Sequence, residues 1–216
     1  MQFDEWEPTY LRILEEMEYD RPSDEASVRL MKMILTNSDL IDDDDLRTYI
    51  RGKVVVTGGA KFSVNDVPEY DTLIATGSSI PYLLENAIIP DVIVTDLDGD
   101  VEAQKAASSK GAVTLIHAHG DNADELILHA KDFKGKILMT TQSKPELTVY
   151  NFGGFTDGDR AVCTADAMGA RKITLIGFDF NVPEKKTDSN FYIKKKKLAW
   201  AKNIIENMVS TDIVFL

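Results

Sequence analysis

The feature that most constrains the fold is an alternation, from Lys53 onward, of short β-branched runs with segments whose apolar residues recur at helical spacing. The runs occupy residues 54–57, 72–76, 92–95, 113–117, 137–141, 173–176 and 213–215. The helical segments occupy residues 80–87, 101–110, 123–133, 160–169 and 193–208. Strands that read as continuous apolar runs between helices are typically buried on both faces. The sequence therefore predicts an α/β fold, a doubly wound, mostly parallel sheet with helices on both faces.

The residues before this alternation follow a different pattern. Apolar side chains in residues 1–52 recur at helical spacing, and Ser23 with Asp24 and Glu25 is typical of the start of a second helix. No chemistry is visible in this segment. We expect a helical N-terminal extension over residues 1–52 and an α/β catalytic domain over residues 53–216, a length that one hydrophobic core can support.

Charge and hydropathy exclude several classes of function. The net charge of -12 argues against a nonspecific nucleic-acid surface, which needs clustered basic residues. No apolar run reaches the roughly 20 residues of a membrane-spanning helix, and residues 1–10 do not resemble a signal peptide. The single cysteine, Cys163, permits no internal disulfide and no cysteine-rich metal site. We expect a cytoplasmic protein without nucleic-acid or membrane partners, and the sequence leaves a homodimer open.

Ligands of doubly wound sheets bind beyond the carboxyl ends of the strands. The residues that follow the runs in this chain are small, polar or acidic, which is typical of the rim of an active site. They are Gly58-Gly59, Gly77-Ser78-Ser79, Asp96-Leu97-Asp98-Gly99-Asp100, His117-Ala118-His119-Gly120-Asp121-Asn122, Thr140-Thr141-Gln142 and Gly177-Phe178-Asp179.

Asp96 and Asp98 follow one of the runs at a spacing of two. In extended geometry this spacing puts both carboxylates on one side of the chain. Two such oxygen ligands suit Mg²⁺, which takes one or two carboxylates together with substrate phosphates and keeps several waters. The alternative is a turn that uses Asp and Gly for their local conformation.

A second acidic turn follows the next run. Asp121 is expected either to complete the metal site from the neighbouring strand or, with Asn122, to cap the helix that begins after it. His117 and His119 alternate along the run, and zinc would need a third ligand beside them. We favour His119 as a partner of phosphate and His117 as partly buried.

Two later segments are candidates for phosphate or base contacts. Gly153 and Gly154 precede Thr156 and Asp157 near a helix start, where a backbone without Cβ atoms allows a ligand to approach closely, although such turns also serve packing alone. The late basic segment contains Lys185, Lys186 and the four lysines at 194–197. The lysines at 194–197 form either a loop that folds over phosphates or the solvated first turn of a helix.

In combination these strings resemble a known family. PDVIVTDLDGD, IHAHGDN, TTQ, NFGGFTDGDRA and IGFDF, followed by the lysine-rich segment, are similar to the archaeal 6-hydroxymethyl-7,8-dihydropterin pyrophosphokinases, which are related to thiamine pyrophosphokinases. The similarity runs from about Lys53 to the C-terminus, with the motifs in the family's order. It implies transfer of a diphosphate from ATP to the hydroxymethyl group of a reduced pterin, with Mg²⁺ as cofactor and AMP as a product.

The resemblance also assigns roles to residues. Asp96 and Asp98 match paired metal-binding aspartates, Asp121 matches a second acidic motif, and Asp157 falls in the glycine-rich loop. We expect Asp98, Asp121 and Asp157 to be catalytic and Asp96, Asp98 and Asp121 to be metal ligands. The residues expected to contact nucleotide or substrate are Gly77, Ser78, Ser79, Thr95, Gly99, His119, Gly120, Asn122, Thr141, Gln142, Gly153, Gly154, Phe155, Thr156 and Lys196.

The chain departs from the family at its first loop, because VVTGGAKFS lacks the Gly-Pro-Ser that relatives often show. Thiamine pyrophosphokinases carry a β-sandwich domain after the α/β domain, whereas this sequence stops at Leu216, which favours the pterin as substrate. Other functions considered are a thiamine pyrophosphokinase, a haloacid-dehalogenase-like phosphatase, a sugar-nucleotide transferase and a nucleotide-binding regulator without chemistry.

Overall fold

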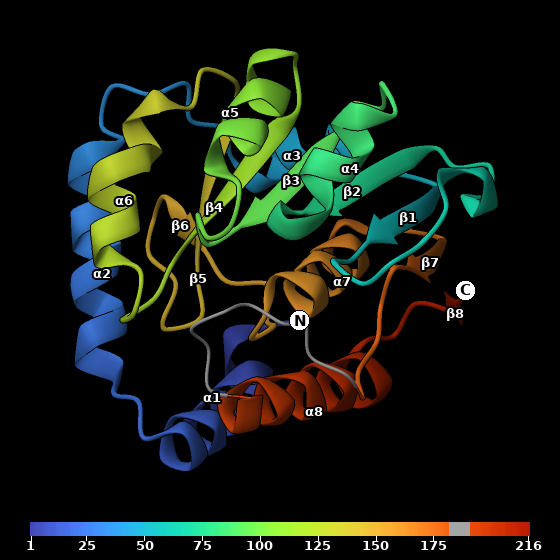
Figure 1. Ribbon diagram of the computed structural model, residues 1–216. Helices are drawn as coiled ribbons and strands as arrows, with labels where there is room; N and C mark the ends of the chain where they lie inside the picture. Colours follow the sequence, from blue (N-terminus) through green and yellow to red (C-terminus); the bar gives the residue numbers. More distant parts are fainter. Residues whose placement is uncertain (182–190) are drawn as a thin grey trace.

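The computed structural model describes residues 1–181 and 191–216 and contains one eight-stranded sheet with the order β6-β5-β4-β3-β2-β1-β7-β8 (Figure 1). All the described strands pair in parallel, so the predicted doubly wound α/β fold is confirmed. The strands are β1 Lys53–Thr57, β2 Thr72–Thr76, β3 Val92–Thr95, β4 Val113–Ala118, β5 Ile137–Thr141, β6 Val149–Tyr150, β7 Lys172–Ile176 and β8 Ile213–Phe215.

Helices cover both faces of this sheet. The α-helices are α1 Phe3–Met17, α2 Arg21–Ile34, α3 Asp43–Tyr49, α4 Ile80–Glu85, α5 Val101–Ser109, α6 Ala123–His129, α7 Asp157–Met168 and α8 Phe191–Met208. Short 3₁₀ turns occupy η1 Val64–Asp66, η2 Gly77–Ser79 and η3 Ala130–Asp132. None of the helices within the described ranges is long and apolar enough to cross a membrane.

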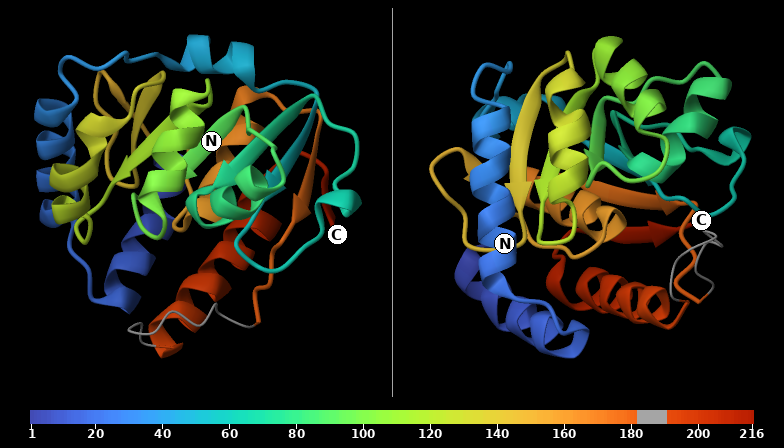
Figure 2. Two further views of the ribbon diagram at one scale, coloured as in Figure 1. Left: turned by 45° about the horizontal axis from the view of Figure 1, so that its top comes forward. Right: turned by 60° about the vertical axis from the view of Figure 1, so that its left-hand side comes forward.

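The alternation of side chains along the strands explains the layers. In β1, Val54 and Val56 pack toward α3 and α7, whereas Val55 packs toward α4 and α5. Because successive side chains of a strand point to opposite faces, a strand covered on both faces must be apolar throughout. Figure 2 shows α2, α4, α5 and α6 on one side of the sheet and α7 on the other.

The N-terminal helices pack tightly onto this body. Trp6 and Tyr10 of α1 are buried in a cluster with Trp200 of α8 and with Cys163 of α7. The helix α2 packs beside α6 against strands β4 and β5. The first helices therefore bury residues of the α/β body, including Cys163.

Several local features differ from the sequence prediction, and three of them follow. The cap of α2 is Asp20, whose carboxylate accepts a hydrogen bond from the backbone N of Ser23, and not the expected group around Ser23. The helix α7 begins at Asp157 because Thr156 and Asp159 form a reciprocal capping box at its N-terminus. The edge strand β6 was not predicted, since two residues carry too little periodicity to be recognised.

Candidate active site at the carboxyl edge of the sheet

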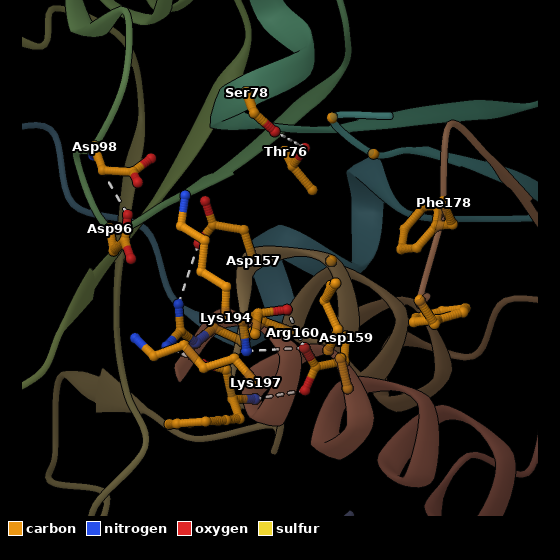
Figure 3. Close-up of a pocket in the computed structure, with 18 of the residues that line it drawn as sticks. Thr76, Ser78, Asp96, Asp98, Asp157, Asp159, Arg160, Phe178, Lys194 and Lys197 are labelled. Atoms are coloured by element: carbon orange, nitrogen blue, oxygen red, sulfur yellow. Dashed lines mark hydrogen bonds and ion pairs between the residues drawn. The ribbon is translucent and has the colours of Figure 1, made fainter. Parts of the chain in front are cut away.

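A cavity of about 390 Å³ lies across the carboxyl ends of the strands and under the first turns of α8. Residues that follow β1, β2, β3, β4, β5 and β7 line it, together with the N-terminus of α7. In the view of Figure 3, Asp96 and Asp98 stand on one side of the pocket and Phe178 on the other. A volume of this order is typical of sites for small molecules and cofactors.

The turn after β3 brings two carboxylates to the cavity. Leu97 adopts a left-handed conformation with φ of 69°, so the expected extended geometry is wrong at this point. Its side chain is buried, and the backbone N of Asp98 donates to Oδ1 of Asp96 at 3.3 Å. Gln104 of α5 holds the turn from behind, because its Oε1 accepts from Thr95 Oγ1 at 2.7 Å and its Nε2 donates to the Asp98 carbonyl at 2.8 Å. Both carboxylates line the cavity.

The surrounding charges favour an ionised Asp96. Nε2 of His119 lies 3.5 Å from Oδ2 of Asp96. Burial would raise the pKa of Asp96, but the contact with His119 and the positive charges of Arg160 and Lys197 outweigh it and lower the pKa well below its usual range. The pKa of Asp157 is raised well above its usual value, first by burial and then by the negative charge of Asp96. Two carboxyl groups of the cavity therefore differ in their affinity for a proton.

The first turn of α7 holds Asp157 and Arg160 in the cavity wall. Nη1 of Arg160 lies 3.1 Å from Oδ1 of Asp157, and Nη2 donates to the Phe155 carbonyl at 2.7 Å. Asp159 accepts from the backbone N atoms of Phe155 and Thr156, so the loop is fixed onto the helix start. The helix N-terminus and the guanidinium are positive groups in this wall that can attract an anion.

The lysine segment lies within α8 and divides between two surfaces. Lys194 and Lys197 line the cavity, whereas Lys196 lies beside α1, where its Nζ is 3.7 Å from Oε1 of Glu16. Of the two alternatives for residues 194–197, the structure shows the helix. Lys185 and Lys186 of the same basic segment lie outside the described residues. The spacing of three between Lys194 and Lys197 puts both on one face of α8.

Aromatic rings hold Lys197 at the cavity. Its Nζ lies 5.7 Å from the centre of the Tyr19 ring and 5.5 Å from that of Phe155. Burial and the neighbouring Asp121 carboxylate, which is its hydrogen-bond partner, raise the pKa of Tyr19 to about 12. Tyr19 therefore stays protonated, and the Asp121 carboxylate is engaged with a residue of the α1–α2 connection.

The turn after β4 differs from the one after β3. Asn122, which is buried, accepts from the His119 backbone N at 3.0 Å and donates to the carbonyls of Asp96 at 2.9 Å and His117 at 2.7 Å. It therefore ties the ends of β3 and β4 together. Asp121 is exposed and is not among the residues that line the cavity.

The two histidines of β4 and its turn do not form a zinc site. Nδ1 of His117 lies 3.0 Å from Thr140 Oγ1, and burial, with Arg160 nearby, lowers the pKa of His117 well below its usual value. In the described parts of the chain, no three His, Cys, Asp or Glu side chains gather into a metal-binding group. His117 is therefore a neutral, buried residue, and His119 alone of the pair lines the cavity.

Close backbone packing forms the opposite end of the cavity. A Cβ atom on Gly58 would lie 2.4 Å from the Gly177 carbonyl, so glycine is required where the loops after β1 and β7 touch. Gly177 itself has φ of 74°. Phe178 lies against Gly158 of α7, and its ring centre is 5.9 Å from that of Phe180. This end presents apolar rings and backbone, whereas the middle presents charges.

The expected contact residues separate into two groups. Those that line the cavity are Ser78, Asp96, Asp98, His119, Gln142, Phe155, Thr156 and Asp157. Those that do not line it are Gly77, Ser79, Thr95, Gly99, Gly120, Asp121, Asn122, Thr141, Gly153, Gly154 and Lys196. For Gly154 the close approach is to the protein itself, because a Cβ would lie 2.5 Å from Cα of Arg160.

Sequence reasoning missed several lining residues. Thr76 follows the same rule of strand ends that identified Ser78 and was recognisable on that ground. Arg160 lies inside a quoted motif, but no role was assigned to it. Sequence does not show which of the neighbouring residues Lys196 and Lys197 lines the cavity, because that depends on the direction of each side chain. Tyr19 had no signal, since it comes from the α1–α2 connection, far away in the sequence.

Comparison with known proteins gives consistent matches. A sequence model of the family described as "6-hydroxymethylpterin diphosphokinase MptE-like" matches residues 63–185. The chain is 40% identical over 219 residues to the 6-hydroxymethyl-7,8-dihydropterin pyrophosphokinase of Pyrococcus furiosus, covering 95% of this chain and 94% of the relative. It is 36% identical to the protein of the same name from Methanocaldococcus jannaschii, with 95% of each chain covered. The protein of that name from Methanothermobacter thermautotrophicus is 38% identical over 83% of this chain and 79% of its own length.

Proposed function

The chain belongs to the 6-hydroxymethylpterin diphosphokinase MptE-like family, and from this premise we propose that it transfers a diphosphate from ATP to the hydroxymethyl group of 6-hydroxymethyl-7,8-dihydropterin. In this reaction the hydroxymethyl oxygen attacks the β-phosphorus, and the bond between that phosphorus and the oxygen bridging it to the α-phosphorus breaks. AMP leaves, and the hydroxyl proton passes to a base.

The observation that carries this proposal is the arrangement of charges in the cavity. Two carboxylates on the turn after β3 share one cavity with Arg160, Lys194 and Lys197. Transfer of phosphoryl groups depends mainly on positioning and on stabilisation of spread negative charge, with little covalent participation by the protein. A site that combines metal-type ligands with cations meets this requirement.

Asp96 and Asp98 fit Mg²⁺ as a cofactor. Mg²⁺ takes one or two carboxylates and completes its shell with water and substrate phosphates. The lowered pKa of Asp96 keeps one of these ligands ionised. The ion, when bound, would neutralise charge on the phosphates. Asp121, expected from the sequence as a third ligand, has its carboxylate at Tyr19 and is not required in this scheme.

The other lining residues have separate tasks. Lys194 and Lys197 would contact phosphate oxygens from the α8 side, and Arg160 would do so from α7. Asp157 is placed beside Arg160 in the cavity wall, where its carboxylate would orient the attacking hydroxyl and accept its proton. Phe178 and Phe180 offer flat apolar contacts for a ring at the opposite end.

A direct assay tests the proposed function. The protein would be incubated with ATP and Mg²⁺ and with either 6-hydroxymethyl-7,8-dihydropterin or thiamine, and products would be identified by mass spectrometry. We expect AMP and the pterin diphosphate ester from the first mixture and neither AMP nor an ester from the second. Absence of AMP in both mixtures would reject the assignment, and an ester of thiamine would transfer it to the thiamine branch.

The same samples discriminate the remaining functions. Trapping of a phosphorylated Asp96 would support a phosphatase of the haloacid-dehalogenase type. Tighter binding of a sugar nucleotide than of ATP would support a sugar-nucleotide transferase, and binding of ATP without turnover of any acceptor would support a regulator. We expect none of these three results.

A further inference from the structure

A buried carboxylate from the N-terminal helices lies behind the substrate cavity. Asp24 of α2 is 2% exposed. It accepts hydrogen bonds from Tyr10 Oη at 2.6 Å, from the Gly120 backbone N at 2.7 Å and from Nε2 of Gln142 at 2.9 Å. These donors come from α1, from the turn after β4 and from the residue that follows β5. One side chain thus joins three segments that are far apart in the sequence.

The contact with Asp24 determines which way the Gln142 amide points. Because Nε2 of Gln142 donates to Oδ2 of Asp24, the NH₂ group of the amide is turned toward the carboxylate. The amide oxygen Oε1 is the other branch of the same planar group. Within the described residues this oxygen has no hydrogen-bond partner, although Gln142 is only 3% exposed and lines the cavity. Buried polar atoms are normally paired, so an unpaired acceptor on a residue of the cavity wall points to a missing partner.

The main chain of Gln142 is also immobilised. Its carbonyl oxygen accepts from Trp6 Nε1 at 2.8 Å and from Asn151 Nδ2 at 3.0 Å. Neither the backbone nor the amide of Gln142 can rotate without breaking a buried hydrogen bond. The acceptor is therefore held in place before a ligand arrives, which favours specificity for a ligand with a matching donor.

Resting on the proposed function, we propose that Asp24 is a positioning residue that fixes the Gln142 amide so that its Oε1 accepts a hydrogen bond from an N–H group of a substrate ring. Both substrates of the proposed reaction carry such a group. A reduced pterin has ring and exocyclic N–H donors, and adenine has an exocyclic amino group. The shared chemistry is a planar heterocycle with a donor edge, and the test below separates the two rings.

The test compares Michaelis constants and separate binding constants. Gln142→Leu removes the acceptor, and we expect it to raise the KM of one ring substrate by roughly tenfold, the range of one lost hydrogen bond. The KM of the other substrate should stay within about twofold in the same assay. Whether the KM for pterin or for ATP rises identifies the ring that Gln142 contacts.

Asp24→Asn tests the positioning role. Its neutral amide no longer dictates the orientation of Gln142, so the same KM should rise, by less than with Gln142→Leu. In the Gln142→Leu background the change at Asp24 should add almost nothing, because it acts through Gln142. Effects that multiply, or a KM that neither variant changes, would overturn the proposal.

Matched variants control for folding. Asp166→Asn removes another carboxylate that accepts several hydrogen bonds, from Ser210 and Thr211, but does not line the cavity, so both KM values should stay unchanged. Should Asp24→Asn not fold, Tyr10→Phe removes one donor to Asp24, and Gln142→Met replaces Gln142→Leu. Fluorescence titrations of 6-hydroxymethyl-7,8-dihydropterin and of ATP, each alone, measure how Gln142→Leu changes the dissociation constant of each substrate. These constants can be measured even if the wild-type protein transfers no diphosphate. Failure of the reaction and failure of this inference are therefore distinguishable.

Discussion

The turns after β3 and β4 look alike in sequence, and the structure gives them different tasks. Each follows an interior strand and carries aspartate beside glycine. The first turn places Asp96 and Asp98 in the cavity, while the second uses Asn122 to brace the strand ends and directs Asp121 to Tyr19. What separates them is the neighbouring structure: Gln104 of α5 supports one turn, and Asp24 of α2 holds the other. Residue type and spacing identify candidate site residues, but tertiary packing determines which of their side chains line the cavity.

The largest effect is expected at the turn after β3. Asp98→Asn keeps the size of the side chain but removes a charged ligand, and we expect kcat to fall at least about a hundredfold, the range of losing one electrostatic contact in a transition state. Steady-state assays of AMP release at saturating pterin and ATP would measure this. The thermal midpoint should remain within a few degrees of wild type, because Asp98 is exposed. A variant with near wild-type kcat would remove the distinction between the two turns.

The next effect separates two neighbouring lysines. Lys197→Gln removes a cation that faces Asp96 across the cavity, and we expect kcat/KM for ATP to fall roughly tenfold to a hundredfold, as for a charge-assisted hydrogen bond. Lys196→Gln is the matched control, since Lys196 pairs with Glu16 and should leave kcat/KM within about twofold. A larger loss of kcat/KM in Lys196→Gln than in Lys197→Gln would contradict this prediction.

Loss of the Asn122 side chain, which joins the two turns, should mainly reduce the stability of the protein. Asn122→Ala leaves the carbonyls of Asp96 and His117 and the His119 amide without this partner, and we expect the free energy of unfolding to fall by about 1–3 kcal/mol. Urea denaturation followed by circular dichroism would measure the loss. Asn207→Ala, at an exposed position of α8, is the control and should change stability by less than about 0.5 kcal/mol. Equal losses at both positions would show that Asn122 does not join the strand ends.

The smallest effect is expected at Asp121. Because its carboxylate contacts Tyr19 and does not line the cavity, Asp121→Asn should lower kcat by less than about threefold. The measurement is the same AMP-release assay that is used for Asp98→Asn, with both proteins at one Mg²⁺ concentration. A loss as large as that of Asp98→Asn would restore Asp121 as a metal ligand and make the two turns equivalent.

The sequence predicted the parts of this protein that depend on local pattern. The strands at residues 72–76, 92–95 and 137–141 have the predicted bounds, because buried parallel strands are continuous apolar runs. The cavity lining contains Asp96, Asp98 and Asp157, which the strand-end rule and the family's motifs indicated.

The remaining features depend on contacts between distant segments. Tyr19 and Asp24 reach the site only because α1 and α2 pack against α8, β4 and β5. Leu97 turns into a left-handed conformation that residue spacing does not indicate. The direction of Lys196 away from the cavity follows from its place on α8 and from Glu16 on α1. Such choices are made by tertiary packing and have no local signature.

Calorimetric titration of ATP into the protein, with and without Mg²⁺, is the most direct measurement of whether Asp96 and Asp98 hold the cofactor against the polyphosphate. For wild type we predict that Mg²⁺ tightens ATP binding, and for Asp96→Asn and Asp98→Asn that this tightening is largely lost while the proteins remain folded. An undiminished effect of Mg²⁺ in both variants would contradict the account.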